Sequence, residues 1–251
     1  MKPILFSLGP FHLYSFGVTV AAGVLLSLLL MTRRAQRDGF PRPDDVFDLV
    51  FVVVAFGFLG ARLFYVFQNF EGYRAHPLSI FAIWEGGLIF YGGVMGALVA
   101  LFVFMKIRGI PFLKGLDFLL PYESLAHGFG RIGCFFNGCC GGRLCSLPWG
   151  VKFPGSAFPT HPTQLYEAAF DFAFFFFLNS RTARKKFDGE ISGLYFMTYA
   201  VARFVIEFYR EGNPGWIFTW NQWLSLGVFL IAFSLMISKR RLLRRPTASS
   251  Q

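Results

Sequence analysis

The sequence predicts an all-α polytopic membrane protein with about seven transmembrane helices and a small irregular periplasmic cap. Hydrophobic residues make up 55% of the 251 residues, and 35 residues are phenylalanine. Soluble domains reach roughly 45–50% only when glycine is counted, and about 25% of their residues are charged. Only 15% are charged here, and apolar runs of about 20 residues, the length that crosses a bilayer, recur along the chain. A soluble globular domain and a disordered chain are both excluded.

The first three expected spans are 12–31, 46–67 and 88–105, which are apolar runs separated by short polar connections. No small-residue cleavage site follows the first run, so we expect it to remain as a span and not to be a removed signal peptide. The second span is unusual because it contains an arginine, Arg62.

The remaining four expected spans are 115–130, 164–179, 190–209 and 221–238. The first of these is the weakest prediction, because it is short and contains polar residues. These residues are Asp117, Glu123 and His127.

The net charge of +10 comes largely from basic clusters between and after the apolar runs. In a soluble chain this excess would suggest nucleic acid, but in a membrane protein it marks cytoplasmic loops. We therefore expect no nucleic-acid partner. The clusters comprise Arg33, Arg34, Arg37 and Arg42; Lys106, Arg108 and Lys114; Arg181, Arg184, Lys185 and Lys186; and Lys239, Arg240, Arg241, Arg244 and Arg245.

Placing all these clusters in the cytoplasm requires an odd number of crossings, with a periplasmic N-terminus and a cytoplasmic C-terminus. We interpret 1–251 as a single integral membrane domain. The outer connections are then 68–87, 131–163 and 210–220. The middle one, rich in Gly, Pro and Cys, is the expected cap, and the tail at about 246–251 is expected to be disordered.

Charged residues within the apolar segments suggest either a structural ion pair or an anion site. Arg203 and Glu207 are four residues apart, hence on one helix face, and Arg210 follows them. A charge at the bilayer centre costs at least ~2.5–3.5 kcal/mol and normally faces a polar cavity. Arg131 and Arg143 lie near the outer side, where the positive-inside rule disfavours them, and this favours an anion site.

The segment 127–142 contains six glycines and Arg131. Glycine lets the backbone approach a ligand closely, and a guanidinium is suited to bidentate contacts with phosphate. Glycine beside arginine is common in loops, so this pattern alone is a weak indication of a phosphate site.

The four cysteines lie within twelve residues, and three interpretations stay open: buried free thiols, at least one disulfide, or metal or catalytic chemistry. A periplasmic location permits disulfides. No C-x-x-C pair is present, and the histidines are not at a usual ligand spacing. The spacing therefore predicts no metal site. The cysteines are Cys134, Cys139, Cys140 and Cys145.

Several motifs, in the same order, resemble the prolipoprotein diacylglyceryl transferase family of bacteria, from Leu8-Gly9-Pro10 to the last span. The matching segments are Gly60-Ala61-Arg62-Leu63; Gly86-Gly87-Leu88; Gly130-Arg131-Ile132-Gly133 with Asn137 and Gly142; His161-Pro162-Thr163-Gln164-Leu165-Tyr166-Glu167; and Tyr199 with Arg203-Phe204-Val205-Ile206-Glu207-Phe208-Tyr209-Arg210-Glu211. No single motif is as specific as their combination.

The resemblance implies an inner-membrane enzyme that transfers the diacylglyceryl group of phosphatidylglycerol to the lipobox cysteine of a prolipoprotein signal peptide. A thioether forms, glycerol phosphate leaves, and no cofactor takes part. The implied catalytic residues are Arg131, Arg203, Glu207 and Tyr91. The implied substrate-binding residues are Arg62, Arg131, Asn137, Gly142, Arg143, His161, Gln164, Tyr166, Glu167, Tyr199 and Arg210.

The identity of a general base stays open, because Tyr91 stands where the family often has histidine. Two further departures are Phe16 for a tyrosine and Cys134 for an asparagine. His127 and His161 could act as bases, although structural hydrogen bonding is the more common role.

Two competing functions are an organic-anion transporter and a thiol–disulfide carrier. A transporter predicts inverted repeats, and the sequence shows no such repeat.

Overall fold

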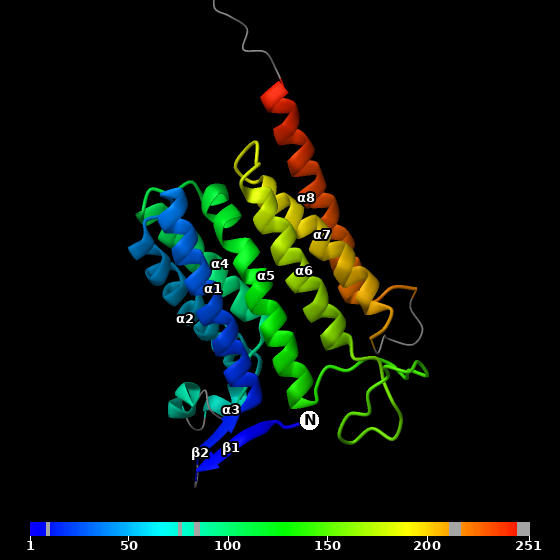
Figure 1. Ribbon diagram of the computed structural model, residues 1–251. Helices are drawn as coiled ribbons and strands as arrows, with labels where there is room; N and C mark the ends of the chain where they lie inside the picture. Colours follow the sequence, from blue (N-terminus) through cyan, green and yellow to red (C-terminus); the bar gives the residue numbers. More distant parts are fainter. Residues whose placement is uncertain (9–10, 75–76, 83–85, 211–216, 245–251) are drawn as a thin grey trace, which may run out of the picture. The chain divides into compact units, whose positions relative to one another are not determined.

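The computed structural model describes residues 1–8, 11–74, 77–82, 86–210 and 217–244, and these are mostly helical (Figure 1). The predicted tail at 246–251, the motif residues Gly9, Pro10 and Glu211, and most of the connection 210–220 lie outside the described residues. The elements are β1 (Ile4–Leu8), β2 (Phe11–Tyr14), α1 (Ser15–Asp38), α2 (Pro43–Gln68), α3 (Phe70–Arg74), the 3₁₀ helix η1 (Pro77–Phe81), α4 (Phe90–Ile107), α5 (Phe112–Asn137), α6 (Thr163–Thr182), α7 (Glu190–Glu207) and α8 (Trp220–Arg244).

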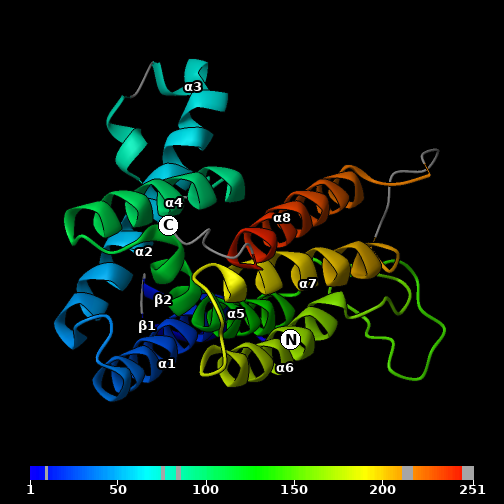
Figure 2. The same ribbon diagram turned by 90° about the horizontal axis from the view of Figure 1, so that it is seen from above.

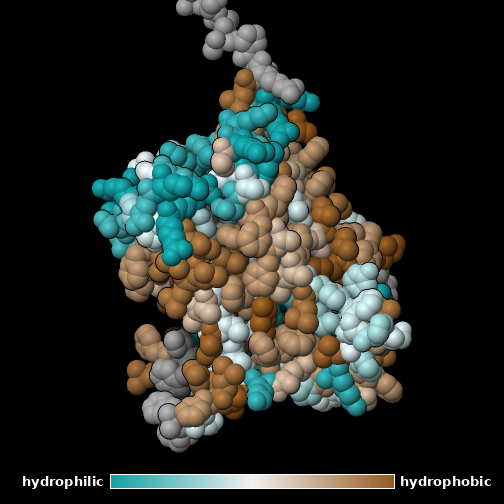
Figure 3. All heavy atoms as spheres, in the orientation of Figure 1, coloured by the Kyte–Doolittle hydropathy of each residue, from teal (hydrophilic) through white to brown (hydrophobic). Residues whose placement is uncertain are grey.

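A long helix corresponds to each of the seven predicted spans. Four of them, α1, α2, α4 and α8, are long and apolar enough to cross a membrane. Hydrophobic side chains cover much of the visible helical surface in Figure 3, and many large apolar residues are exposed, as expected of helices that face lipid. The first span begins later than predicted, because β2 takes up residues 12–14 and pairs antiparallel with β1.

The chain forms two compact units: Met1–Ser27 with Leu116–Gln251, and Leu28–Gly115. In the first unit, α5, α6, α7 and α8 lie side by side (Figures 1 and 2). In the second, α2 packs on α4. The single membrane domain expected from the sequence stays a prediction.

Glycines allow α2 and α4 to approach closely in the second unit. A Cβ atom added at Gly60 would lie 3.0 Å from the Cα of Gly96, and one at Gly92 would lie 2.6 Å from the Cβ of Phe64. Small residues at such crossings are a common basis for helix association in membranes. Any larger residue at these positions would separate the two helices.

The cap was expected from residue 131, and this boundary is wrong, because α5 continues to Asn137. Arg131 therefore lies on a helix and not in a glycine-rich loop. Gly133 serves close packing: a Cβ atom there would lie 3.0 Å from the Phe16 ring. The irregular segment occupies 138–162 and contains only isolated β-bridges among the described residues.

The polar residues that weakened the prediction of span 115–130 have partners on neighbouring helices. Asp117 is fully buried and accepts hydrogen bonds from the backbone N–H groups of Gly189 (2.8 Å) and Ser192 (2.8 Å). These groups belong to the first turn of α7, whose own N-cap residue, Gly189, supplies no side-chain bond. The Asp117 carboxylate thus caps the N-terminus of α7, where unpaired backbone N–H groups and the helix dipole favour a negative charge.

Replacing Asp117 with asparagine is expected to lower the melting temperature of the protein in detergent. The new amide would keep one acceptor oxygen but would place an NH₂ group against N–H donors, and an unsatisfied buried donor costs about 1–3 kcal/mol. Circular dichroism melts measure the change. Asp44→Asn is the control, because Asp44 is exposed; an equal loss in both variants would contradict the capping role.

Candidate active site

Glu167, on α6, is the centre of a buried charged group in the first unit. Its carboxylate lies 2.5 Å from Nη2 of Arg131 on α5, 4.0 Å from Nη1 of Arg203 on α7, and 3.6 Å from Nη1 of Arg210. Only 3% of Glu167 is exposed. One carboxylate therefore brings together three arginines from separate parts of the chain.

Glu207, at the end of α7, is the second carboxylate of this group. It lies 2.8 Å from Nη2 of Arg203, which confirms the predicted pair four residues apart, and 3.7 Å from Nε of Arg210. Thr219 and Asn221 also donate hydrogen bonds to it, at 3.0 Å and 2.9 Å. Glu207 therefore has neutral as well as charged partners. We call Arg131, Arg203, Arg210, Glu167 and Glu207 the arginine–glutamate cluster.

The cluster has one more positive than negative charge, and some of its donors are unused. Among the described residues, the buried Nε of Arg131 and Nη1 of Arg203 have no hydrogen-bond partner. The carboxylate oxygens of Glu167 form ion pairs but no well-aligned hydrogen bond. The guanidinium groups thus keep N–H groups for an anion, and three arginines can bind a phosphate at several oxygens.

The backbone beside the cluster is held by a small network of hydrogen bonds. The Gly142 N–H donates to the His161 carbonyl (2.8 Å), and the Arg143 N–H donates to that of Tyr209 (3.0 Å). Gly142 also forms a β-bridge with Arg210. A Cβ atom at Gly142 would collide with the Tyr209 carbonyl. Gly142 therefore fixes the position of Arg210 through its backbone.

The segment from His161 to Glu167 links the irregular segment to the cluster. His161 Nδ1 lies 3.1 Å from the Tyr166 hydroxyl, and Trp149 Nε1 donates a hydrogen bond to the same hydroxyl at 2.8 Å. Gln164, fully buried, donates to the Cys139 carbonyl. Each of these predicted substrate-binding residues thus has a structural partner within the first unit.

Three further predicted residues of this unit lie around the cluster. Arg143 is exposed, and its guanidinium lies 6.0 Å from the centre of the Tyr209 ring. Asn137 is the last residue of α5, two residues before Cys139. Tyr199 stacks on Tyr195 at 5.8 Å between ring centres.

Arg62 and Tyr91 belong to the second unit. Arg62 donates to the carbonyls of Ser79 (2.7 Å), Ile80 (2.8 Å) and Gly86 (2.6 Å), so its guanidinium holds the connection between α3 and α4. Tyr91 is 55% exposed, and its ring contacts that of Phe90.

Glu167 was predicted as a substrate-binding residue, but its central position follows only from the structure, and Asp171 was not predicted at all. His127 Nδ1 lies 2.8 Å from the Asp171 carboxylate, one turn along from the pair of Arg131 and Glu167. His127 and Arg131 are four residues apart on α5, as Glu167 and Asp171 are on α6. This matched spacing of opposite charges on two helices is the signal that could have indicated the contact.

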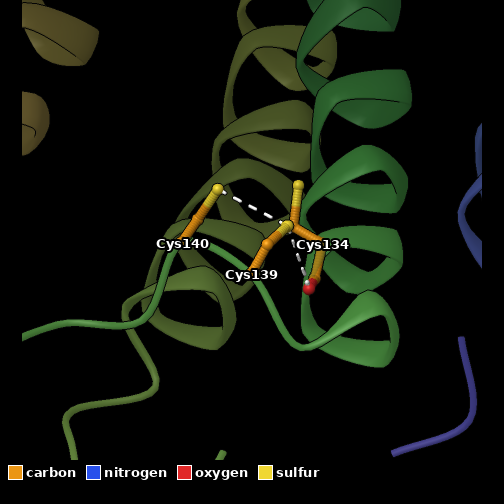
Figure 4. Close-up of side chains that lie close together, drawn as sticks. All are labelled: Cys134, Cys139 and Cys140. Atoms are coloured by element: carbon orange, nitrogen blue, oxygen red, sulfur yellow. Dashed lines mark hydrogen bonds between the residues drawn. The ribbon is translucent and has the colours of Figure 1, made fainter. Parts of the chain in front are cut away.

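The four cysteines are free thiols, which counts against the disulfide interpretation; Cys145 is buried, whereas Cys140 is exposed. Cys134, at the end of α5, and the following Cys139 and Cys140 point toward one another (Figure 4). A hydrogen bond from Cys134 and the nearby charges of Arg210 and Arg131 lower the pKa of Cys140 to about 5, although desolvation opposes this. Desolvation raises the pKa of Cys139.

Comparison with known proteins shows similarity along nearly the whole chain. The family model described as "Prolipoprotein diacylglyceryl transferase" matches residues 3–238. The phosphatidylglycerol–prolipoprotein diacylglyceryl transferase of Clostridium tetani is 36% identical over 241 residues, covering 92% of this chain and 95% of the relative. That of Chromohalobacter salexigens is 37% identical over 236 residues (92% and 87%), and that of Pseudomonas paraeruginosa is 35% identical over 261 residues (99% and 98%).

Proposed function

The chain belongs to the prolipoprotein diacylglyceryl transferase family, and we propose that it transfers the diacylglyceryl group of phosphatidylglycerol to the lipobox cysteine of prolipoproteins. The reaction forms a thioether, releases glycerol phosphate and is the first step of bacterial lipoprotein maturation. We place this reaction at the arginine–glutamate cluster. Three arginines there lie around the Glu167 carboxylate, and two of them have an N–H group without a hydrogen-bond partner among the described residues.

The cluster suits the charge that develops in this reaction. The substrate sulfur attacks the glyceryl carbon, the carbon–oxygen bond to phosphate breaks, and the electron pair stays on the phosphate oxygen. The phosphate gains a negative charge as it leaves. Donors already aimed at a developing anion usually give the largest single contribution to catalysis. Arg131 and Arg203 are proposed to contact the phosphate, and Arg210 to assist them.

Glu167 and Glu207 are positioning residues in this proposal. Glu167 holds Arg131 from α5 near Arg203 and Arg210, and Glu207 orients Arg203 across one helical turn. Without the carboxylates, three like charges would repel one another in a buried place. An incoming phosphate would compete with the carboxylates for the guanidinium groups.

The nucleophile belongs to the substrate, and its activation can come from the same positive charges. A thiol has a pKa of about 8.5 and reacts as the thiolate. Neighbouring cations favour the charged form, so the arginines can supply thiolate without a dedicated base. Tyr91 is proposed to contact the lipid, because its side chain is exposed near the start of α4, beside Phe90.

The proposed assay combines purified protein, phosphatidylglycerol vesicles and a lipobox peptide, with mass spectrometry of the peptide. The expected result is a peptide heavier by one diacylglyceryl group, together with released glycerol phosphate. A peptide with serine in place of cysteine should stay unmodified. Absence of product, together with uptake of an organic anion into proteoliposomes, would favour the transporter instead.

We further propose that all seven long helices cross the inner membrane, with the N-terminus in the periplasm and the C-terminus in the cytoplasm. The basic clusters support this orientation, because Lys and Arg accumulate in cytoplasmic loops. A fusion of a cytoplasmic reporter after Arg241 is expected to be active, and a periplasmic reporter at the same position inactive. Activity of the periplasmic reporter would contradict an odd number of crossings.

A further inference from the structure

Three cysteine sulfurs meet beside the arginine–glutamate cluster. The Sγ atoms of Cys134, Cys139 and Cys140 all lie within 4.8 Å of one another (Figure 4). Those of Cys139 and Cys140 are 3.6 Å apart. In the chain that the structure describes, no other His, Cys, Asp or Glu side chain joins this group. The fourth cysteine, Cys145, is buried elsewhere in the irregular segment.

The backbone is arranged to bring these thiols together. After α5, Gly138 takes a φ of 73° and Cys140 a φ of 65°, and Cys140 is the one residue other than glycine in the described chain with a positive φ. This conformation is unfavourable for cysteine and persists only where neighbours hold it. Thr163 donates to the Cys140 carbonyl at 3.0 Å, and Gln164 donates to that of Cys139. The first turn of α6 thus fixes the turn that carries two of the thiols.

The arrangement of the three sulfur atoms fits the binding of a thiophilic metal ion better than the packing of cysteine side chains in a hydrophobic core. A Zn–S distance of about 2.3 Å in a tetrahedral site places two sulfurs about 3.8 Å apart. The sulfurs of Cys139 and Cys140 are 3.6 Å apart, and no pair among the three is separated by more than 4.8 Å, so small side-chain rotations would complete the site. Thiolates select Zn²⁺ and Cu⁺ among biological metals.

The charge balance favours Zn²⁺ over Cu⁺. Three thiolates with Zn²⁺ leave one negative charge, whereas Cu⁺ would leave two. Arg131 lies one helical turn before Cys134 on α5 and can balance that single charge, although it is also paired with Glu167.

We propose that Cys134, Cys139 and Cys140 bind one Zn²⁺ ion and that its fourth coordination position receives the substrate thiolate. The sequence predicted no metal site because the usual C-x-x-C spacing is absent. In the structure, the end of α5 and the turn after it bring the three thiols together without that spacing. Zinc sites with three protein ligands keep a position for water or substrate, and a thiolate is the ligand type that matches the other three.

The second part of this inference rests on the proposed function. On binding, the lipobox thiol would lose its proton to water, and its sulfur would then form the bond to the glyceryl carbon. The carbon–oxygen bond to phosphate breaks, and glycerol phosphate leaves beside the arginines. The thioether product is a weaker ligand than a thiolate, so it can leave the ion.

The first experiment measures metal in protein purified in detergent under reducing conditions. The expected result is about one zinc per chain, and charge-transfer absorption from thiolate to cobalt after Co²⁺ replaces Zn²⁺. Cys139→Ser and Cys140→Ser should lose both signals, whereas the matched control Cys145→Ser should keep them. No bound metal, copper in place of zinc, equal retention in all variants, or a disulfide found by mass spectrometry would each overturn the site.

The second experiment adds a lipobox peptide to the Co²⁺-loaded protein without phosphatidylglycerol. A change in the cobalt spectrum is expected with the cysteine peptide and not with its serine counterpart, and an unchanged spectrum would overturn the substrate-thiolate part. This test needs no transfer to occur. If the spectrum changes but zinc-loaded protein forms no thioether with phosphatidylglycerol, the proposed function fails while the metal site stands.

Discussion

Replacing Arg131 with alanine is expected to slow diacylglyceryl transfer by about 10²–10³-fold, and Arg203→Ala is expected to have a similar effect. Removing one preorganised donor to a developing anion costs ~2.7–4 kcal/mol. Both side chains are mostly buried and keep a donor without a partner among the described residues. The measurement is the rate of thioether formation on a lipobox peptide at saturating phosphatidylglycerol.

Lysine should restore little of this rate, because a point charge lacks the planar bidentate fork of arginine. Arg181→Ala serves as the control, since Arg181 is 43% exposed and pairs with Glu190 outside the cluster. A purely structural role predicts that alanine variants lose melting temperature in proportion to activity. Folded Arg131→Ala protein that transfers at a near-parental rate would contradict the proposal.

Replacing Glu167 with glutamine is expected to harm both folding and transfer, more than Glu207→Gln does. Breaking a buried pair by removing one partner costs about 3–5 kcal/mol, and Glu167 faces three arginines. Glu207 also accepts bonds from Thr219 and Asn221, and a glutamine oxygen can keep those. Glu207→Gln should therefore lose less.

Melting temperatures in detergent and transfer rates, measured on both variants, test this order. The double variant Arg131→Ala with Glu167→Gln should be less destabilised than the sum of the single changes, because the two residues contact each other. Additive effects would show that the pair does not act as a unit. Equal losses in Glu167→Gln and Glu207→Gln would contradict the central position of Glu167.

The sequence predicted the helices well, because hydropathy records which segments avoid water. It was less successful where polar residues interrupt them. Span 115–130 was the weakest prediction, yet α5 is 26 residues long. Its polar residues are paired with other helices, as Asp117 is with the first turn of α7. The hydropathy of one segment does not show whether its charged side chains have partners on other helices.

The glycine-rich signature shows the same limit. The glycine-rich segment after residue 130 was expected to belong to the irregular cap, but α5 continues to Asn137, and Gly133 allows α5 to pack against α1. Local composition indicates flexibility, whereas packing decides how each glycine is used. The pair of Arg203 and Glu207 was predictable, because both residues lie on one helix at a spacing that brings side chains together.

By itself, the sequence determined the helical class and the family, and it predicted which arginines are candidates for contact with a phosphate. It did so because hydropathy, charge and short motifs are properties of contiguous residues. Only the tertiary structure decided that Glu167 joins Arg131, Arg203 and Arg210, that three cysteines converge, and that Arg62 holds backbone carbonyls. These contacts join residues far apart in the chain, and their geometry depends on which helix faces pack together.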